Sequence, residues 1–326
     1  MKKKLVRYII LAVIFCAVPL VSPNNYVVQI INMAGIYMIL AMGFNILAGY
    51  AGQVSLGQAA FFAIGAYGSA LLNTHFGLPF WATLPASVVI SIIFGVILAI
   101  PALKVRGKYL VLLTIGFGEI VRLVLLNWQA VTGGTSGVLK IEAPSIFGYE
   151  LFSLKSYYYL ILVFVVLLFL YQKRLIHTRA GRALIAIRED EAAAELSGIN
   201  LSRYKIKAFA IAAAFSGIAG CLYAHMMRYI SPDCFRYDES VTILSMAVVG
   251  GIGTLAGPLI GSLILTVLPE LLRSVGDFRL VIYGALLIAV VMFCPGGLLQ
   301  GFVAIRRKLL KIVNKRGGAD CEPFGS

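Results

Sequence analysis

Glu119 and Arg122 are ionisable residues inside an apolar segment, LTIGFGEIVRLVLLNW, where charged side chains are rare. They stand three positions apart, so on a helix they share a face and can form an ion pair. A charge in hydrocarbon is costly, which makes it a candidate for function by default. Two interpretations stay open: a self-neutralising pair that faces a helical bundle, and a position for Glu119 beside the entrance of a substrate pathway.

Motifs for hydrolytic, covalent or metal-assisted catalysis are absent from the sequence. Gly107-Lys108 is followed by Tyr109 and has no glycine five positions earlier, so it does not form a phosphate-binding loop. The five cysteines and three histidines have neither the CxxC pattern nor the spacing of metal ligands. We therefore expect a protein that is not an enzyme and that holds no metal and no cofactor.

Two hydrophobic segments, 49–72 and 250–268, are interrupted by glycines in a related way. Hydrophobic segments broken at corresponding places are the best sequence indication of a transporter's pathway, although close helix packing through small residues explains the glycines equally well. Polar side chains at membrane depth in the first segment must be satisfied by protein or water. The candidate pathway residues are Gly49, Gly52, Gln53, Ser55, Gln58, Glu119, Gly250, Gly251, Gly253 and Thr254.

The composition indicates an all-α polytopic membrane protein. Of 326 residues, 60% are hydrophobic and only 13% are charged, against about 25% charged in soluble domains. The net charge of +14 does not indicate nucleic acid, because no nucleic-acid-binding module accompanies it. Most lysines and arginines instead fall in four clusters, as expected of cytoplasmic loops: 1–7, 104–108, 173–207 and 306–316.

Hydropathy predicts about ten transmembrane segments, with a range of eight to ten. Two short spans within 240–272 are favoured over one tilted helix, because ten spans place both basic termini in the cytoplasm. The first segment is favoured as an uncleaved span over a signal peptide, because it lacks a cleavage pattern. We expect a membrane domain over 1–305, an outside loop at 128–155 and a disordered basic tail at 306–326. The spans lie near 5–22, 26–48, 58–73, 80–102, 109–127, 156–172, 206–228, 240–272 (two) and 278–295.

Residues 173–207 form a long basic and polar insert that has the character of a docking element. Good helix formers occupy 181–195, and Gly198 is a suitable C-terminal stop. We expect one amphipathic helix over 181–198 that fits a groove on a soluble partner. The alternative is a helix lying on lipid headgroups, which three consecutive acidic residues disfavour.

The insert resembles the EAA loop of ABC-importer permeases, with Glu191-Ala192-Ala193 and Gly198 in the key places. Its glycine lies one residue late and no Leu-Pro follows, which is usual in the permeases of branched-chain amino acid importers. Position 58, often histidine in that family, is Gln58 here, which puts an ionisable role at this position in doubt. The remaining resemblance, to the M-type subunit, lies in GYAGQVSLGQAAFFAIGAYGSALL, LTIGFGEIVRLVLLNWQAVTGGTSGV, AFSGIAGCLYAHMMRYISPDCF and SMAVVGGIGTLAGPLIG.

The resemblance implies a permease in the bacterial inner membrane that pairs with a second, homologous permease. Two ATP-binding cassette subunits would drive the pair, and a periplasmic or lipid-anchored binding protein would deliver leucine, isoleucine, valine or related amino acids. The fold would resemble the ten-helix permeases of sugar and vitamin importers. The residues implied in coupling to the ATPase are Gly181, Arg182, Glu189, Asp190, Glu191, Ala192, Ala193 and Gly198.

Three rival functions stay open at this point. A urea or short-chain amide importer permease would look much alike, because backbone motifs do not report the ligand. An ion-coupled carrier working alone would usually show several buried carboxylates, and Glu119 is the only clear one here. A membrane scaffold without transport activity is the remaining class.

Overall fold

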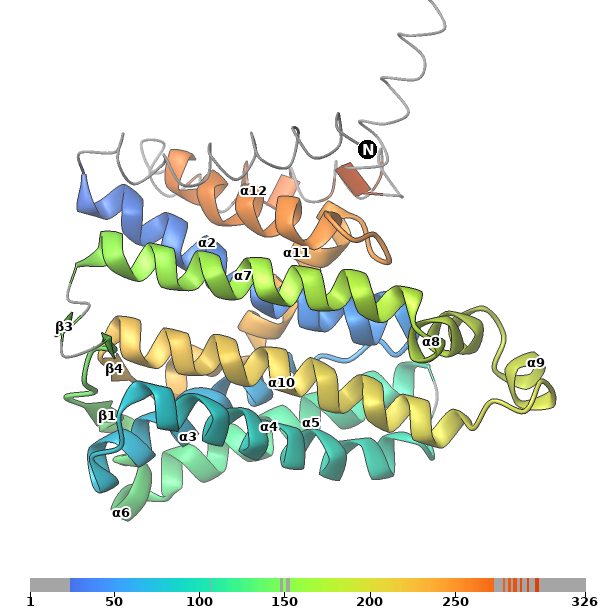
Figure 1. Ribbon diagram of the computed structural model, residues 1–326, viewed down its shortest axis with the longest axis horizontal. Helices are drawn as coiled ribbons and strands as arrows, with labels where there is room; N and C mark the ends of the chain where they lie inside the picture. Colours follow the sequence, from blue (N-terminus) through green and yellow to red (C-terminus); the bar gives the residue numbers. More distant parts are fainter. Residues whose placement is uncertain are drawn as a thin grey trace, which may run out of the picture.

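The protein is an assembly of packed helices in the computed structural model, drawn in Figure 1. The structure describes residues 24–105, 107–146, 149–150 and 153–272, with isolated positions between 278 and 298. The predicted span 5–22, the tail 306–326 and most of the predicted span 278–295 lie outside these residues. The helices are α2 (Asn25–Phe44), the π-helix η1 (Asn45–Tyr50), α3 (Gln58–Phe76), α4 (Phe80–Ala102), α5 (Lys108–Asn127), α6 (Gln129–Thr132), the 3₁₀ turn η2 (Gly134–Ser136), α7 (Leu154–His177), α8 (Arg179–Glu189), α9 (Glu191–Leu196), α10 (Leu201–Met227), the 3₁₀ turn η3 (Pro232–Phe235), α11 (Tyr237–Gly250) and α12 (Gly257–Leu271).

Five of the described helices are long and apolar enough to cross a membrane. They are the continuous pair α2–η1 and the helices α4, α5, α7 and α10. Each coincides with a predicted span, which confirms an all-α membrane protein. The α3 helix occupies the predicted span 58–73, and its first sixteen residues are almost all buried.

Helix α10 is the centre of the bundle, packed against α3, α4 and α2 (Figure 1). Small residues permit this packing: a Cβ on Gly65 of α3 would lie 2.5 Å from the Cα of Gly217 in α10. A Cβ on Gly220 would similarly meet the backbone of α3 at Phe62 and Ala66. Residues this small let two helix backbones approach closely. Lipid tails are as apolar as the side chains of the helices, so helices in a membrane associate through close van der Waals packing and not through the hydrophobic effect.

The end of the bundle opposite α8 and α9 is closed by short strands (Figure 1). β1 (Val138–Leu139) pairs with β4 (Tyr229–Ile230) in an antiparallel register, and β2 (Ser145–Ile146) pairs with β3 (Tyr149–Glu150). His225 adds a buried tie, because its Nδ1 lies 2.7 Å from the Glu142 carbonyl and its Nε2 lies 2.9 Å from Ser69 Oγ. The described part of the predicted loop 128–155 therefore packs on the ends of α3 and α10.

Two helices are interrupted inside the bundle, as the glycine-broken segments predict. The chain leaves η1 at Tyr50 and becomes helical again only at Gln58. It leaves α11 at Gly250 and resumes at Gly257. The fourteen residues of α11 rise about 21 Å, which is short of a hydrocarbon core of about 30 Å. The segment 240–272 thus contains two short helices and not one tilted helix.

The prediction of a single helix over 181–198 was wrong. Asp190 has an extended backbone (φ −156°, ψ 115°) and divides the insert into α8 and α9. Its carboxylate accepts hydrogen bonds from the backbone amides of Ala192 and Ala193, at 2.8 and 3.1 Å. An aspartate that accepts hydrogen bonds from the first free amides of a helix stabilises the start of that helix. Helix α9 therefore begins here as a new helix and does not continue α8. Gly198, at φ +80°, lies just beyond the end of α9.

Candidate functional site

The two helix interruptions meet at one place, and Asn45 joins them. Its Oδ1 accepts the backbone N–H of Gly253 at 2.7 Å, and its Nδ2 donates to the Thr254 carbonyl at 2.9 Å. Asn45 is fully buried in the first turn of η1. We call Asn45, Gly49, Gly52, Gly253 and Thr254 the glycine junction. Residues far apart in sequence, predicted from separate segments, are thus brought together by one side chain.

Glycine is required in the junction for reasons of space and backbone conformation. A Cβ on Gly49 would lie 2.7 Å from the backbone nitrogen of Gly253. Gly52 and Gly253 have φ values of +68° and +77°, a region that residues with a side chain rarely adopt. The junction therefore depends on the absence of side chains at three positions.

Helix α8 reaches the junction through Arg188, whose Nη1 donates to the Gly49 carbonyl at 2.8 Å. Arg188 and Asn45 were not among the residues predicted from sequence. Arg188 was missed because it lies in a run of charged residues, which is typical of a solvent-exposed helix face. Asn45 was missed because it is one polar residue in an apolar helix. A buried asparagine at membrane depth was the available signal, because an amide there needs partners.

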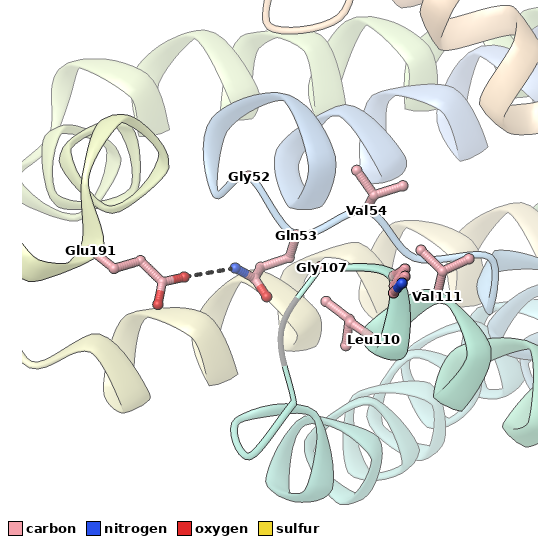
Figure 2. Close-up of a pocket in the computed structure, with 8 residues that line it drawn as sticks. Gly52, Gln53, Val54, Gly107, Leu110, Val111 and Glu191 are labelled. Carbon is pink, nitrogen blue, oxygen red and sulfur yellow. Dashed lines mark hydrogen bonds between the residues drawn. The ribbon is translucent and has the colours of Figure 1, made fainter.

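A cavity of about 360 Å³ opens beside the junction (Figure 2). Gln53 and Glu191, predicted for the pathway and for ATPase coupling respectively, face each other across it, with Nε2 and Oε1 at 3.4 Å. Lys205 of α10 holds the same Glu191 oxygen at 2.6 Å. Glu191 is therefore committed to contacts within its own chain. The cavity is lined by Gly52, Gln53, Val54, Gly107, Lys108, Leu110, Val111 and Glu191.

Ser55 and Gln58 are fully buried; the Ser55 hydroxyl and the Gln58 side-chain oxygen have protein partners, whereas Gln58 Nε2 has none among the described residues. Ser55 Oγ accepts the N–H of Gly57 at 3.2 Å, and Gln58 Oε1 accepts the hydroxyl of Ser216 at 2.7 Å. The Thr114 hydroxyl accepts the N–H of Leu56 at 3.0 Å. The interrupted segment is thus closed by hydroxyl groups from α5 and α10 in this conformation.

Gly250 and Gly251 pack closely against neighbouring backbone. A Cβ on Gly250 would meet the carbonyl of Gly257. The backbone of Gly251 lies so close to Gly297 that a Cβ on Gly297 would meet it. The close-packing explanation therefore accounts for Gly250 and Gly251. The pathway role stays a prediction for both.

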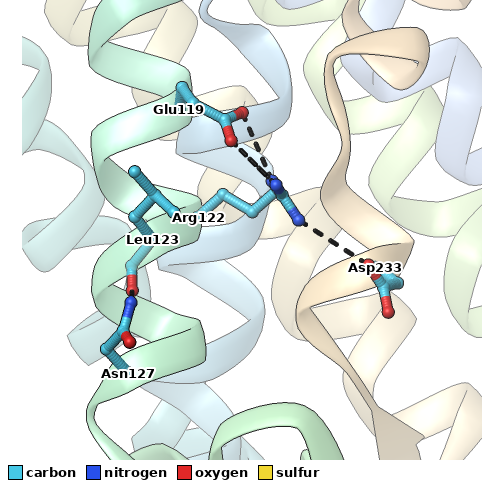
Figure 3. A network of polar contacts seen from close by, with 5 residues as sticks. All are labelled: Glu119, Arg122, Leu123, Asn127 and Asp233. Atoms are coloured by element: carbon cyan, nitrogen blue, oxygen red, sulfur yellow. Dashed lines mark hydrogen bonds and ion pairs between the residues drawn. The ribbon is translucent and has the colours of Figure 1, made fainter.

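Glu119 and Arg122 form the ion pair that their spacing predicts, on α5 (Figure 3). The Nη2 of Arg122 lies 2.8 Å from Oε1 of Glu119, and its Nη1 lies 3.7 Å from the Asp233 carboxylate. Among the described residues, no hydrogen bond or ion pair joins this network to the glycine junction. Much of α5 faces outward: no atom lies within 4 Å of a Cβ built on Gly116 or Gly118.

The residues predicted for coupling divide into an inward and an outward set. Gly181 packs against the end of α7, where a Cβ would meet the backbone of Leu175 and Ile176. The residues of the outward set are exposed on α8, on α9 and on the turns that flank α9. Leu196, which was not among the predicted residues, belongs to the same surface and is 91% exposed. The members of the outward set are Arg182, Glu189, Asp190, Ala192, Ala193, Leu196 and Gly198.

Comparison with known proteins decides the family. The pattern shared by permease components of branched-chain amino acid transport systems matches residues 26–291, which includes the junction, the ion pair and the helices α8 and α9. The chain belongs to this family. It is a transport component of a membrane system and not an enzyme, and its apolar helices make it a multi-pass membrane protein.

Three relatives show how far the likeness of this permease extends. It is 38% identical to the high-affinity branched-chain amino acid transport system permease protein LivM of Salmonella typhimurium, over 83% of this chain and 69% of the relative. It is 36% identical to LivM of Escherichia coli, over 88% and 72%. Against LivH of Salmonella typhimurium the identity is 27%, over 82% and 92%. No solved structure matches the permease significantly.

Proposed function

We propose that this permease carries leucine, isoleucine and valine inward across the bacterial inner membrane as a subunit of an ATP-driven importer. The supporting observation is the family match together with higher identity to LivM than to LivH proteins. A binding protein outside the membrane delivers the amino acid, and two ATP-binding subunits in the cytoplasm supply the energy. A urea or amide importer is less well supported, because the two relatives matched at 38% and 36% identity carry branched-chain amino acid names.

A second permease covers the outward face of α5 in this proposal. Only 17% of the most apolar window of α5 is buried within the chain, and the face includes the Glu119–Arg122 pair. Charges at membrane depth face a protein neighbour or a water-filled cavity, because lipid does not solvate them. The translocation pathway then lies between the α5 helices of the two permeases and ends at the cavity beside Gln53.

The membrane topology follows from charge. Basic clusters at 104–108 and 173–207 lie beside the end of the bundle that carries α8 and α9, which the positive-inside rule assigns to the cytoplasm. With ten spans both termini share that side. Helices α8 and α9 then meet the ATPase, while the strands β1 and β4 lie outside.

Uptake by the purified complex tests the transport proposal. Proteoliposomes that hold both permeases, the ATPases and the cognate binding protein are expected to accumulate radiolabelled leucine only when ATP is enclosed. Excess isoleucine or valine is expected to compete and urea is not. Accumulation that needs no ATP but is abolished by an ionophore would support an ion-coupled carrier. Competition by urea alone would support the amide importer.

The outward set on α9 is expected to form the ATPase contact, and Leu196→Asp tests it. In helix-in-groove docking an apolar side chain of the helix fills the partner's groove, and the exposed Leu196 is placed for that role, so an added charge should be expelled from the groove. We expect about a tenfold or greater loss of co-purifying ATPase and of uptake, the scale of a hot-spot residue. Ser202→Asp, a similar change at an exposed position on α10, is the control. Intact co-purification with Leu196→Asp would exclude α9 from the contact.

A further inference from the structure

We propose that Arg188 is the positioning residue through which helix α8 moves both interrupted helices together. The inference rests on the proposed function, in which α8 and α9 receive the motion of the ATPase. It assigns a single side chain of α8 to the glycine junction, where the two interruptions meet.

The first link is the bond to the Gly49 carbonyl. The helix α2–η1 ends at Tyr50, and the last carbonyl groups of a helix lack partners within it. Arg188 Nη1 donates to the Gly49 carbonyl at 2.8 Å. A cation is also favoured at this helix end, because aligned peptide dipoles leave partial negative charge there. Arg188 therefore supplies a hydrogen-bond donor to the Gly49 carbonyl and a positive charge to the negative end of the helix dipole.

The second link is contact with both interrupted segments at once. A Cβ on Gly52 would lie 3.0 Å from Arg188 Cγ, and a Cβ on Gly253 would lie 2.9 Å from its Nη1. The arginine stem thus lies against the first interruption, and its guanidinium group reaches the second. Any side chain at Gly52 or Gly253 would displace it.

Both ends of this connection are held firmly. On the α8 side, Leu184 and Ile187 are buried, and Glu189 holds the guanidinium group at 2.5 Å. On the other side, Asn45 binds the Gly253 amide and the Thr254 carbonyl. A displacement of α8 would therefore be transmitted to two segments that Asn45 already ties together.

Hydrogen exchange in the full complex tests this connection directly. In the wild type, a non-hydrolysed ATP analogue is expected to change amide exchange in 49–56 and in 251–256 together. With Arg188→Ala we expect that paired response to be lost while the ATPase still co-purifies. The number of leucine molecules imported per ATP should fall roughly tenfold or more, the scale of one hydrogen bond to a charged group. Arg188→Lys, which keeps the cation, should restore part of this ratio.

Arg203→Ala is the matched control, because Arg203 is an exposed arginine at the start of α10. It should keep the wild-type exchange response and transport ratio. The inference is overturned if Arg188→Ala keeps the response in both segments, or if it loses the ATPase and thermal stability together with uptake. Failure of the proposed function is distinguishable, because the wild-type complex itself would then import no leucine with ATP.

Discussion

Replacing Gly65 with leucine is expected to prevent this permease from folding, with loss of the protein from the membrane fraction. A Cβ at this position would lie 2.5 Å from the Cα and 2.7 Å from the carbonyl oxygen of Gly217. Both atoms belong to the backbone of α10, so no side-chain rotation relieves the contact. Overpacking of a buried site costs about 1–3 kcal/mol, and more where backbones must separate. The loss should exceed that range, because α10 also packs against α2 and α4.

The measurement is thermal unfolding of the detergent-solubilised protein, together with its yield. Gly65→Ala is expected to lower the unfolding temperature, although alanine is the better helix former by about 1 kcal/mol. Gly68→Ala, on the same helix, is the control. Its nearest neighbour would be the end of the Ile90 side chain at 3.4 Å, and the Ser87 Cα would lie at an ordinary contact distance of 3.9 Å, so stability should hold or rise. Equal unfolding temperatures for the two alanine variants would show that α3 and α10 can separate without cost.

Replacing Asn45 with valine is expected to abolish uptake while the protein still inserts and assembles. Valine removes both hydrogen bonds of the side chain, which leaves the Gly253 amide and the Thr254 carbonyl without these partners. A buried polar group left unsatisfied costs about 1–3 kcal/mol, so two groups cost roughly 2–6 kcal/mol. The two interrupted segments would then separate locally. The rest of the bundle would stay folded, because nearly all of its hydrophobic core lies outside the glycine junction.

Leucine uptake by the reconstituted complex measures this effect. Asn45→Asp is the informative partner variant, since its carboxylate still accepts the Gly253 N–H but cannot donate to the Thr254 carbonyl. We expect it to retain part of the uptake. Thr242→Val is the control: this hydroxyl donates to the Asp238 carbonyl of its own helix, away from the junction. Wild-type uptake with Asn45→Val would show that the junction does not need this bridge.

Helix positions were predictable because each depends on its local sequence. Apolar runs of about 20 residues specify spans wherever lipid is the solvent, and α4, α5, α7 and α10 follow the predicted ranges closely. The Glu119–Arg122 pair was predictable for the same reason, since spacing on one helix brings the two charges together. Gly198 follows the end of α9 through its own backbone conformation.

The break at Asp190 shows where local reasoning failed. Helix propensity over 181–195 favours continuation, but the aspartate side chain competes for the amides of Ala192 and Ala193. Burial then decided the outcome: Leu184 and Ile187 pack on the bundle, and Glu191 turns inward to Lys205. Propensity alone does not report which face of a short helix is covered.

The sequence by itself determined a multi-pass helical membrane protein, the family to which it belongs, the clustering of basic residues between apolar segments and the two glycine-broken helices. The family was indicated by the resemblance of several motifs along the chain, and the other features depend on composition or on spacing within one segment. Only the tertiary structure decided that the two interruptions meet at Asn45 and that Arg188 connects them to α8. The physical reason is that a hydrogen bond between residues about 200 positions apart leaves no periodicity in the chain. Its donor and acceptor become neighbours only when α2 and α11 pack together.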